Sequence, residues 1–185
     1  MCNSTCIEFG KRNLSQNDVF GKRIIELGSL NVNGGLREYV EQFKPAKYIG
    51  VDIQYGRDVD IVCDAEDISR VLGYQEFDIV ISTEMLEHVF NWRKIINNIK
   101  NLCKNGGIVL ITTRSYGFPL HEYPTDNWRF EVTDMCHIFG DFSDLVVEND
   151  TQDIGVFVKG KKPINHAHTD LTSCKIYNIN YDKRI

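Results

Sequence analysis

The chain has 185 residues, of which 42% are hydrophobic and 25% charged, enough for one domain with a sizeable core. Its formal net charge of −5 argues against a wide basic surface, so we do not expect a nucleic-acid partner. No apolar run reaches the ~18 residues of a membrane helix, and residues 1–16 lack the apolar core of a signal peptide. We therefore expect a cytoplasmic protein with no membrane partner.

The cysteines are scattered along the chain, and in a reducing cytosol we interpret them as free thiols. Cys2 and Cys6 lie close enough in sequence for a redox pair or half of a metal site. No second close pair exists to complete tetrahedral ligation, so we do not predict such a site.

The first informative stretch is residues 22–40. A short apolar run at 24–27 is followed by glycines at 28, 34 and 35, and then by residues 36–40, which can begin a helix. This order predicts a strand, a glycine-containing turn and a helix, a unit in which a ligand can approach bare backbone. Leu30 and Asn33 occupy positions where a dinucleotide fingerprint has glycine, so a turn without a ligand is the alternative.

Acidic residues end the next two predicted strands. Residues 48–51 lead into Asp52, and residues 59–63 lead into Asp64, Ala65 and Glu66. A single Asp after a strand is more often a helix cap, but with Glu26 on the first strand the three acids share one sheet edge, where open α/β sheets bind ligands. Asp52 would also suit a nicotinamide cofactor, although the turn lacks the second glycine that pyrophosphate requires.

The remaining pattern continues the alternation of strands and helices. We predict strands at 77–82 and 108–113, helices at 91–103 and 131–139, and a closing pair of strands at 145–148 and 155–159. Residues 1–160 then form a single domain. Residues 161–185 have little periodicity, and we assign this tail no role.

These features together resemble the class I S-adenosylmethionine-dependent methyltransferases. The resemblance covers about residues 20–160, and its motifs are Glu26-Leu27-Gly28-Ser29, Asp52, Asp64-Ala65, residues 77–80, Glu84-Met85-Leu86-Glu87-His88 and Asn105-Gly106-Gly107 before the fifth strand. Arg114-Ser115 and residues 121–129 look like a subgroup of small stand-alone members. Leu30 and Val32 replace two glycines usual in the family.

The resemblance implies an α/β fold: a Rossmann-like three-layer α/β/α sandwich, with a mostly parallel seven-stranded sheet and an antiparallel last strand. It implies S-adenosyl-L-methionine as cofactor and S-adenosyl-L-homocysteine as product. Glu26 and Gly28 would lie by the methionine part, Asp52 on the ribose, and Asp64 with the Ala65 backbone at the adenine. Ser29, Ile53, Glu66, Thr83 and Glu84 complete the expected cofactor-binding residues.

Glu84, Glu87 and His88 suggest a second kind of site. At the start of a helix, residues three and four apart share a face, so these side chains could converge on a metal, with His121 or His137 as fourth ligand. Some RNA-end and quinone methyltransferases carry a similar E-x-x-E-H, described as binding a divalent metal in the RNA-end group. Methyl transfer needs no metal, so we expect no metal ligand here and interpret the cluster as lining of the cofactor pocket.

The loop of residues 114–129 is the candidate acceptor site, because it leaves the fifth strand at the cofactor edge. We expect Arg114, His121, Arg129 and His88 as catalytic residues. The two arginines would orient an acceptor carboxylate, which would become a methyl ester. A hydroxyl acceptor would instead need His88 or His121 as a base. In the alternative, the arginines only pair with Asp126 or Glu131 to hold the loop.

The sequence therefore predicts a methyltransferase that O-methylates a peptide or small-molecule acceptor in a biosynthetic pathway, as a monomer or weak dimer. One alternative is a metal-dependent RNA-end 2′-O-methyltransferase. Another is a cofactor-binding module without turnover.

Overall fold

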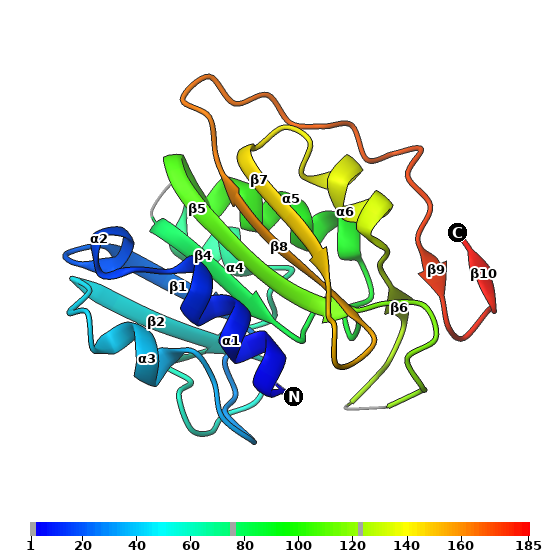
Figure 1. Ribbon diagram of the computed structural model, residues 1–185, viewed down its shortest axis with the longest axis horizontal. Coiled ribbons are helices and arrows are strands. Elements are labelled where there is room, and N and C mark those ends of the chain that lie inside the picture. Colours follow the sequence, from blue (N-terminus) through cyan, green and yellow to red (C-terminus); the bar gives the residue numbers. More distant parts are fainter. Residues whose placement is uncertain (1–2, 75–76, 122–123) are drawn as a thin grey trace.

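The computed structural model describes residues 3–74, 77–121 and 124–185, and a seven-stranded sheet forms its centre (Figure 1). The strand order is β3-β2-β1-β4-β5-β8-β7. Strands β1 to β5 are parallel, and β8 runs antiparallel to both β5 and β7. The strands are β1 (Arg23–Leu27), β2 (Lys47–Asp52), β3 (Ile61–Val62), β4 (Phe77–Thr83), β5 (Cys103–Arg114), β7 (Ser143–Asn149) and β8 (Gly155–Lys161).

Helices cover both faces of this sheet, which makes three layers (Figure 1). One layer is α1 (Ser4–Asn13), α2 (Gln16–Val19) and α3 (Arg37–Glu41); the other is α4 (Ile68–Leu72), α5 (Trp92–Leu102) and α6 (Val132–Ile138). Successive strand residues point to opposite faces. Ile24 accordingly packs with the first layer, whereas its neighbour Ile25 packs with the second. The predicted three-layer fold with an antiparallel last strand is confirmed.

Most predicted elements are present, with shifted ends. The third strand is only Ile61–Val62, whereas the closing strands extend beyond their predicted ends to β7 and β8. The expectation that a helix begins at Glu84 was wrong, because residues 84–90 form a turn and α5 begins at Trp92. The side chain of Asn91 caps α5 by accepting a hydrogen bond from the Lys94 N–H at 3.1 Å.

The tail of residues 161–185 packs along α5 and α6 and ends beside the acceptor loop (Figure 1). Its strands β9 (Tyr177–Asn178) and β10 (Lys183–Arg184) form a second sheet with β6 (Trp128–Arg129). The Lys162 ammonium donates to the carbonyls of Lys100 and Cys103 at 2.7 and 2.9 Å, and Ile176 is completely buried. The tail thus contributes side chains to the core.

Within the described ranges, no helix combines the length and the apolar character needed to cross a membrane.

Because Ile176 is buried in the main core, Ile176→Ala should lower the free energy of unfolding by roughly 2–5 kcal/mol. Ile164, in the same tail but 69% exposed, is the matched control, and its change to Ala should stay within about 0.5 kcal/mol. Urea unfolding measures both. Equal small losses would show that the tail does not support the core.

Candidate active site

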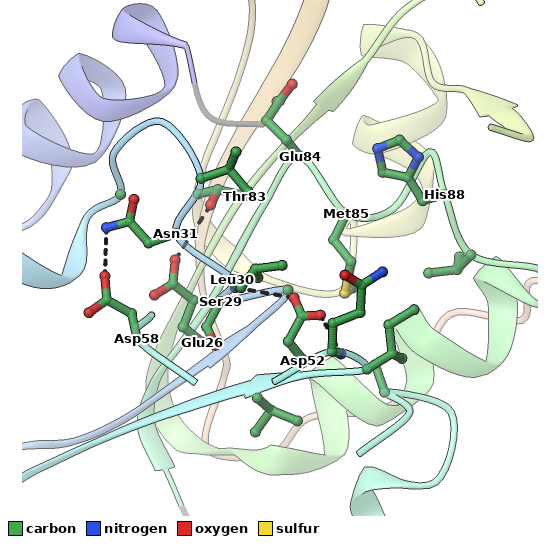
Figure 2. A pocket seen from close by; sticks show the side chains of 18 of the residues that line it. Glu26, Ser29, Leu30, Asn31, Asp52, Asp58, Thr83, Glu84, Met85 and His88 are labelled. Atoms are coloured by element: carbon green, nitrogen blue, oxygen red, sulfur yellow. Dashed lines mark hydrogen bonds between the residues drawn. The ribbon is translucent and has the colours of Figure 1, made fainter. Parts of the chain in front are cut away.

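A cavity lies at the carboxyl ends of β1, β2 and β4 (Figure 2). This is the edge where the predicted acids were expected to meet. All the predicted cofactor-binding residues line it: Glu26, Gly28, Ser29, Asp52, Ile53, Asp64, Ala65, Glu66, Thr83 and Glu84. Of the predicted catalytic residues, His88 lines the cavity, whereas Arg114, His121 and Arg129 lie outside its lining.

Glu26 places a buried carboxyl group on the floor of this cavity. The Tyr48 hydroxyl donates to its Oε2 at 2.7 Å, and the Thr83 hydroxyl to its Oε1 at 3.5 Å. Burial raises the pKa of Glu26 to about 7, although the Tyr48 hydrogen bond works in the opposite direction. A cationic ligand group beside this carboxyl would favour its ionised form and be held by it.

The turn after β1 brings backbone close to the cavity. Gly28 has a φ of 79°, and a Cβ at this position would lie 2.7 Å from the Met85 Cβ. Glycine therefore satisfies both the left-handed backbone and the close approach. The neighbouring Ser29 also lines the cavity, and its buried hydroxyl has no hydrogen-bond partner in the described parts of the chain.

Asp52 ends β2 with its carboxylate held by backbone. Its Oδ2 accepts from the Leu30 N–H at 3.1 Å, and its Oδ1 from the Gln54 N–H at 2.9 Å (Figure 2). Each oxygen keeps a further lone pair. The carboxylate is thus fixed in orientation and can still accept hydrogen bonds from two neighbouring hydroxyl groups.

The residues after β3 divide their contacts between the cavity and α5. Asp64 accepts from the Glu66 N–H at 2.8 Å, and the Ala65 carbonyl accepts from the Asn98 side chain at 2.8 Å. The Glu66 carboxylate accepts from the Asn91 N–H and lies 3.4 Å from the Lys94 ammonium, at the start of α5. Glu66 therefore lines the cavity while its charge is engaged by the helix.

Sequence reasoning missed several lining residues. Asn31 and Asp58, joined by a 2.6 Å hydrogen bond, border the glycine turn, and Met85 packs beneath Gly28. Phe90 also lines the cavity although it is 73% exposed. The available signal for Phe90 in the sequence was an aromatic residue two positions after the E-x-x-E-H motif. Asp58 gave none, because it belongs to a loop between two strands.

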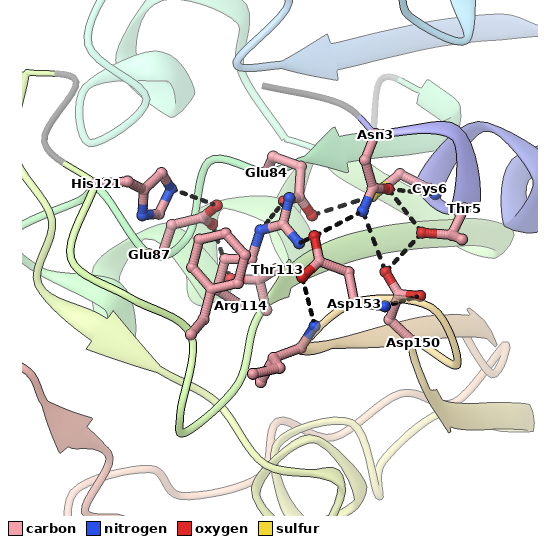
Figure 3. Close-up of polar contacts among 12 residues, drawn as sticks. Asn3, Thr5, Cys6, Glu84, Glu87, Thr113, Arg114, His121, Asp150 and Asp153 are labelled. Carbon is pink, nitrogen blue, oxygen red and sulfur yellow. Dashed lines mark hydrogen bonds and ion pairs between the residues drawn. The ribbon is translucent and has the colours of Figure 1, made fainter.

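Glu84 lies at the cavity edge but turns its carboxylate toward α1 (Figures 2 and 3). Its φ of 53° puts it in the left-handed region. The carboxylate forms a buried ion pair with Arg114 and accepts a hydrogen bond from the Cys6 thiol at 3.2 Å. The thiol of Cys6 thus contacts Glu84, whereas Cys2, considered with Cys6 from the sequence as a redox pair or metal site, lies outside the described residues.

Neither arginine of the acceptor loop has a free side chain. Arg114 also donates to Asp153 at 3.0 Å and stacks on the Phe118 ring. Arg129 is completely buried and makes two 2.6 Å hydrogen bonds to the two carboxylate oxygens of Asp126. The catalytic role expected of these arginines stays a prediction. In the structure both side chains are engaged within the protein, and Arg129 forms the loop-holding pair that the sequence left as an alternative.

Asp126 also orients His121. Its Oδ2 accepts from both the backbone N–H and the ring Nδ1 of His121, at 2.8 and 2.9 Å. Burial raises the pKa of Asp126, but the hydrogen bonds from Arg129 and His121 outweigh it and hold that pKa well below its usual range. The His121 ring packs edge-on against the His88 ring, with centroids 4.9 Å apart. Glu122 and Tyr123, also in the predicted acceptor loop, lie outside the described residues.

A mostly parallel sheet with this strand order and acids at its carboxyl edge is a Rossmann-like fold, whose cavity lies at the edge where such sheets bind nucleotide cofactors. Residues 5–144 match the family model described as a methyltransferase domain. The chain belongs to this family, as a class I S-adenosylmethionine-dependent methyltransferase.

Similar proteins agree with this assignment. A ubiquinone biosynthesis O-methyltransferase of Idiomarina loihiensis is 24% identical over 135 residues, which cover 66% of this chain and 51% of the relative, so the chain spans about half its length. A 1,6-didemethyltoxoflavin-N1-methyltransferase of Burkholderia thailandensis, solved with S-adenosylhomocysteine, superposes with a TM-score of 0.65 at 10% identity, over 86% of this chain and 79% of that one. An S-adenosylmethionine-dependent methyltransferase of Mesorhizobium loti superposes with a TM-score of 0.62 at 14% identity, over 86% of this chain and 99% of that one.

Removal of the Arg129 side chain would leave the buried Asp126 carboxylate without its cationic partner. Arg129→Ala should therefore lower the free energy of unfolding by roughly 3–5 kcal/mol. Urea unfolding measures this. Arg57→Ala is the control, since Arg57 is 70% exposed. An Arg129 variant of normal stability with reduced kcat/KM would instead mean that this arginine binds the acceptor.

Proposed function

We propose that the chain transfers the methyl group of S-adenosylmethionine to a hydroxyl oxygen of a small-molecule or peptide acceptor. The observation that carries this proposal is the pair of neighbouring imidazoles, His88 and His121, beside a cavity edge where both nearby arginines are already engaged. Bound S-adenosylmethionine supplies an electrophilic methyl group on a sulfonium.

The cavity fits this cofactor. We assign Glu26 and the unpartnered Ser29 hydroxyl to the methionine part, where a carboxylate would meet the ammonium group. Asp52 would accept from the ribose hydroxyls. Asp64 and the Ala65 backbone would border the adenine, between Ile53 and Phe90 in the lining.

The engaged arginines are our reason for proposing a hydroxyl over a carboxylate acceptor. The expectation of a carboxylate acceptor needed at least one arginine free to bind it in fork geometry. Arg114 is committed to Glu84 and Asp153, and Arg129 to Asp126. Without them a carboxylate would enter beside the buried Glu87 carboxyl group with neither arginine free to bind it. A neutral hydroxyl needs no such cationic partner.

A hydroxyl acceptor must lose its proton as the methyl group arrives. In each histidine Nδ1 faces an oxygen acceptor, the Thr125 carbonyl for His88 and the Asp126 carboxylate for His121. Nδ1 therefore carries the hydrogen, and a neutral ring presents Nε2 as a base. The acceptor loop would exclude water and align the hydroxyl with the methyl group for in-line displacement.

Two further observations support this class of acceptor. The Idiomarina loihiensis relative is named an O-methyltransferase. The net charge of −5 opposes an RNA substrate, whose phosphates would require a basic surface. Activity at a small hydroxyl is therefore our conclusion, and the acceptor's identity is to be found by screening.

Removing the Asp52 carboxylate should leave ribose hydroxyls unpaired, so Asp52→Ala should weaken S-adenosylhomocysteine binding by roughly 1–3 kcal/mol in calorimetry. Asp67→Ala is the matched control, because Asp67 lies in the same region but outside the cavity lining. Equal affinities for both variants and the wild type would contradict the ribose assignment.

The methylated product should resist mild alkali, as an ether does and an ester does not. Hydroxyaromatic acids are suitable probes, since they offer a hydroxyl and a carboxylate on one ring. Mass spectrometry before and after alkali identifies the modified oxygen. An alkali-labile product from the best acceptor would overturn the hydroxyl proposal, and cofactor binding without product from any acceptor would indicate a module without turnover.

A further inference from the structure

Three side chains converge beside the cofactor cavity without hydrogen bonds to one another. Glu87 and His88 belong to the turn after β4, and His121 belongs to the loop after β5 (Figures 2 and 3). The Glu87 Oε1 lies 3.7 Å from the His88 Nε2 and 4.0 Å from the His121 Nε2. One ligand atom from each residue lies within 4.8 Å of the other two.

Both imidazoles are fixed with the same nitrogen inward. The Nδ1–H of His88 donates to the Thr125 carbonyl, and the Nδ1–H of His121 to the Asp126 carboxylate. In a neutral ring this leaves the Nε2 lone pair directed at Glu87. Metal-ligating histidines characteristically donate their other N–H to a carbonyl or carboxylate in this manner.

Glu87 supplies an independent observation. Its side chain is completely buried, and its Oε2 accepts from the Thr113 hydroxyl at 2.9 Å. Its Oε1 has no hydrogen-bond partner among the residues that the structure describes. Distances of 3.7 and 4.0 Å are too long for hydrogen bonds to the histidines. They suit atoms that share one ion, each about 2.0–2.2 Å from it.

Glu84 does not belong to this group, because its carboxylate is paired with Arg114 on the side toward α1. His137, the other ligand considered from sequence, is exposed on α6. The metal hypothesis drawn from the E-x-x-E-H spacing therefore changes: Glu84 leaves the set, and of the two histidines considered as a fourth ligand only His121 lies with Glu87 and His88.

We propose that Glu87, His88 and His121 bind a divalent transition-metal cation. Two imidazole nitrogens and one carboxylate oxygen favour Zn²⁺ over Mg²⁺. Three protein ligands leave one position open, as in catalytic zinc sites. The inference rests on the proposed hydroxyl acceptor: at the open position the hydroxyl would have its pKa lowered by the cation. In the metal-bound protein the cation would thus replace the base role that Nε2 of His88 or His121 has in the metal-free protein.

A second group with similar residues differs in one decisive contact. Asp141, His166 and His168 also bring possible ligand atoms together. The Lys100 ammonium already lies 2.8 and 2.7 Å from the two Asp141 oxygens. The His166 Nε2 lies 2.9 Å from one of the same oxygens. A cation at this place would be repelled by Lys100, so the group serves as a control.

Calorimetric titration of metal-free protein with ZnCl₂, in the presence of saturating S-adenosylhomocysteine, tests the site. The wild type should bind one equivalent. His88→Ala, His121→Ala and Glu87→Gln should each weaken binding at least about tenfold. His168→Ala and His137→Ala should leave the affinity within about twofold. Thermal unfolding of each variant distinguishes loss of a metal ligand from loss of folding. In the Glu87→Gln protein the amide oxygen can still accept the hydrogen bond from the Thr113 hydroxyl, so this variant should keep its fold.

Absence of zinc binding by the wild type would overturn the proposal. Unchanged zinc affinity in folded His88→Ala and His121→Ala would also overturn it, and so would loss of zinc binding in His168→Ala but in none of the three ligand variants. The readout is binding, so its failure is distinct from failure of the proposed function. Zinc binding at these residues together with an alkali-labile methyl product would keep the metal site and reject the hydroxyl acceptor.

Discussion

The arrangement of the site depends on one buried carboxylate, that of Asp126. Arg129 binds both of its oxygens, and the backbone and ring of His121 share one of them. Because an unpaired charge in the interior is costly, the pair holds Asp126, Arg129 and His121 in fixed positions relative to one another. The Asn180 side chain donates to the Asp126 carbonyl at 2.8 Å, which ties the tail to the same point. His121 is thereby held beside Glu87 and His88.

The sheet and the loops build different parts of the site. Parallel strands end at one edge, so β1, β2 and β4 bring Glu26, Asp52 and Thr83 to one cavity without any special loop. The acceptor side is built from the turn after β4 and the loop after β5, where the Asn127 and Trp128 N–H groups both donate to the Glu87 carbonyl. Cofactor binding thus follows from the fold, whereas acceptor chemistry follows from loop contacts particular to this chain.

This division explains what the sequence could predict. Apolar runs and acids at strand ends depend on local pattern, so the sheet, its layers and the cavity lining were predictable. The partner of a buried arginine depends on tertiary packing. Nothing in the spacing of Arg114 indicated its pairing with Glu84, whose left-handed backbone also replaced the expected helix start. The tail lacks periodicity because its first three buried residues, Lys162, Leu171 and Ile176, follow one another at intervals of nine and five residues, which match neither a helix nor a strand.

The central claim is that the cavity at the carboxyl edge binds S-adenosylmethionine in the orientation set by β1, β2 and β3. A crystal structure of the complex with S-adenosylhomocysteine tests it most directly. We predict the amino-acid part beside Glu26 and Ser29, both ribose hydroxyls on Asp52, and the adenine bordered by Asp64 between Ile53 and Phe90. A ligand bound elsewhere, or in this cavity with the ribose away from Asp52, would contradict it.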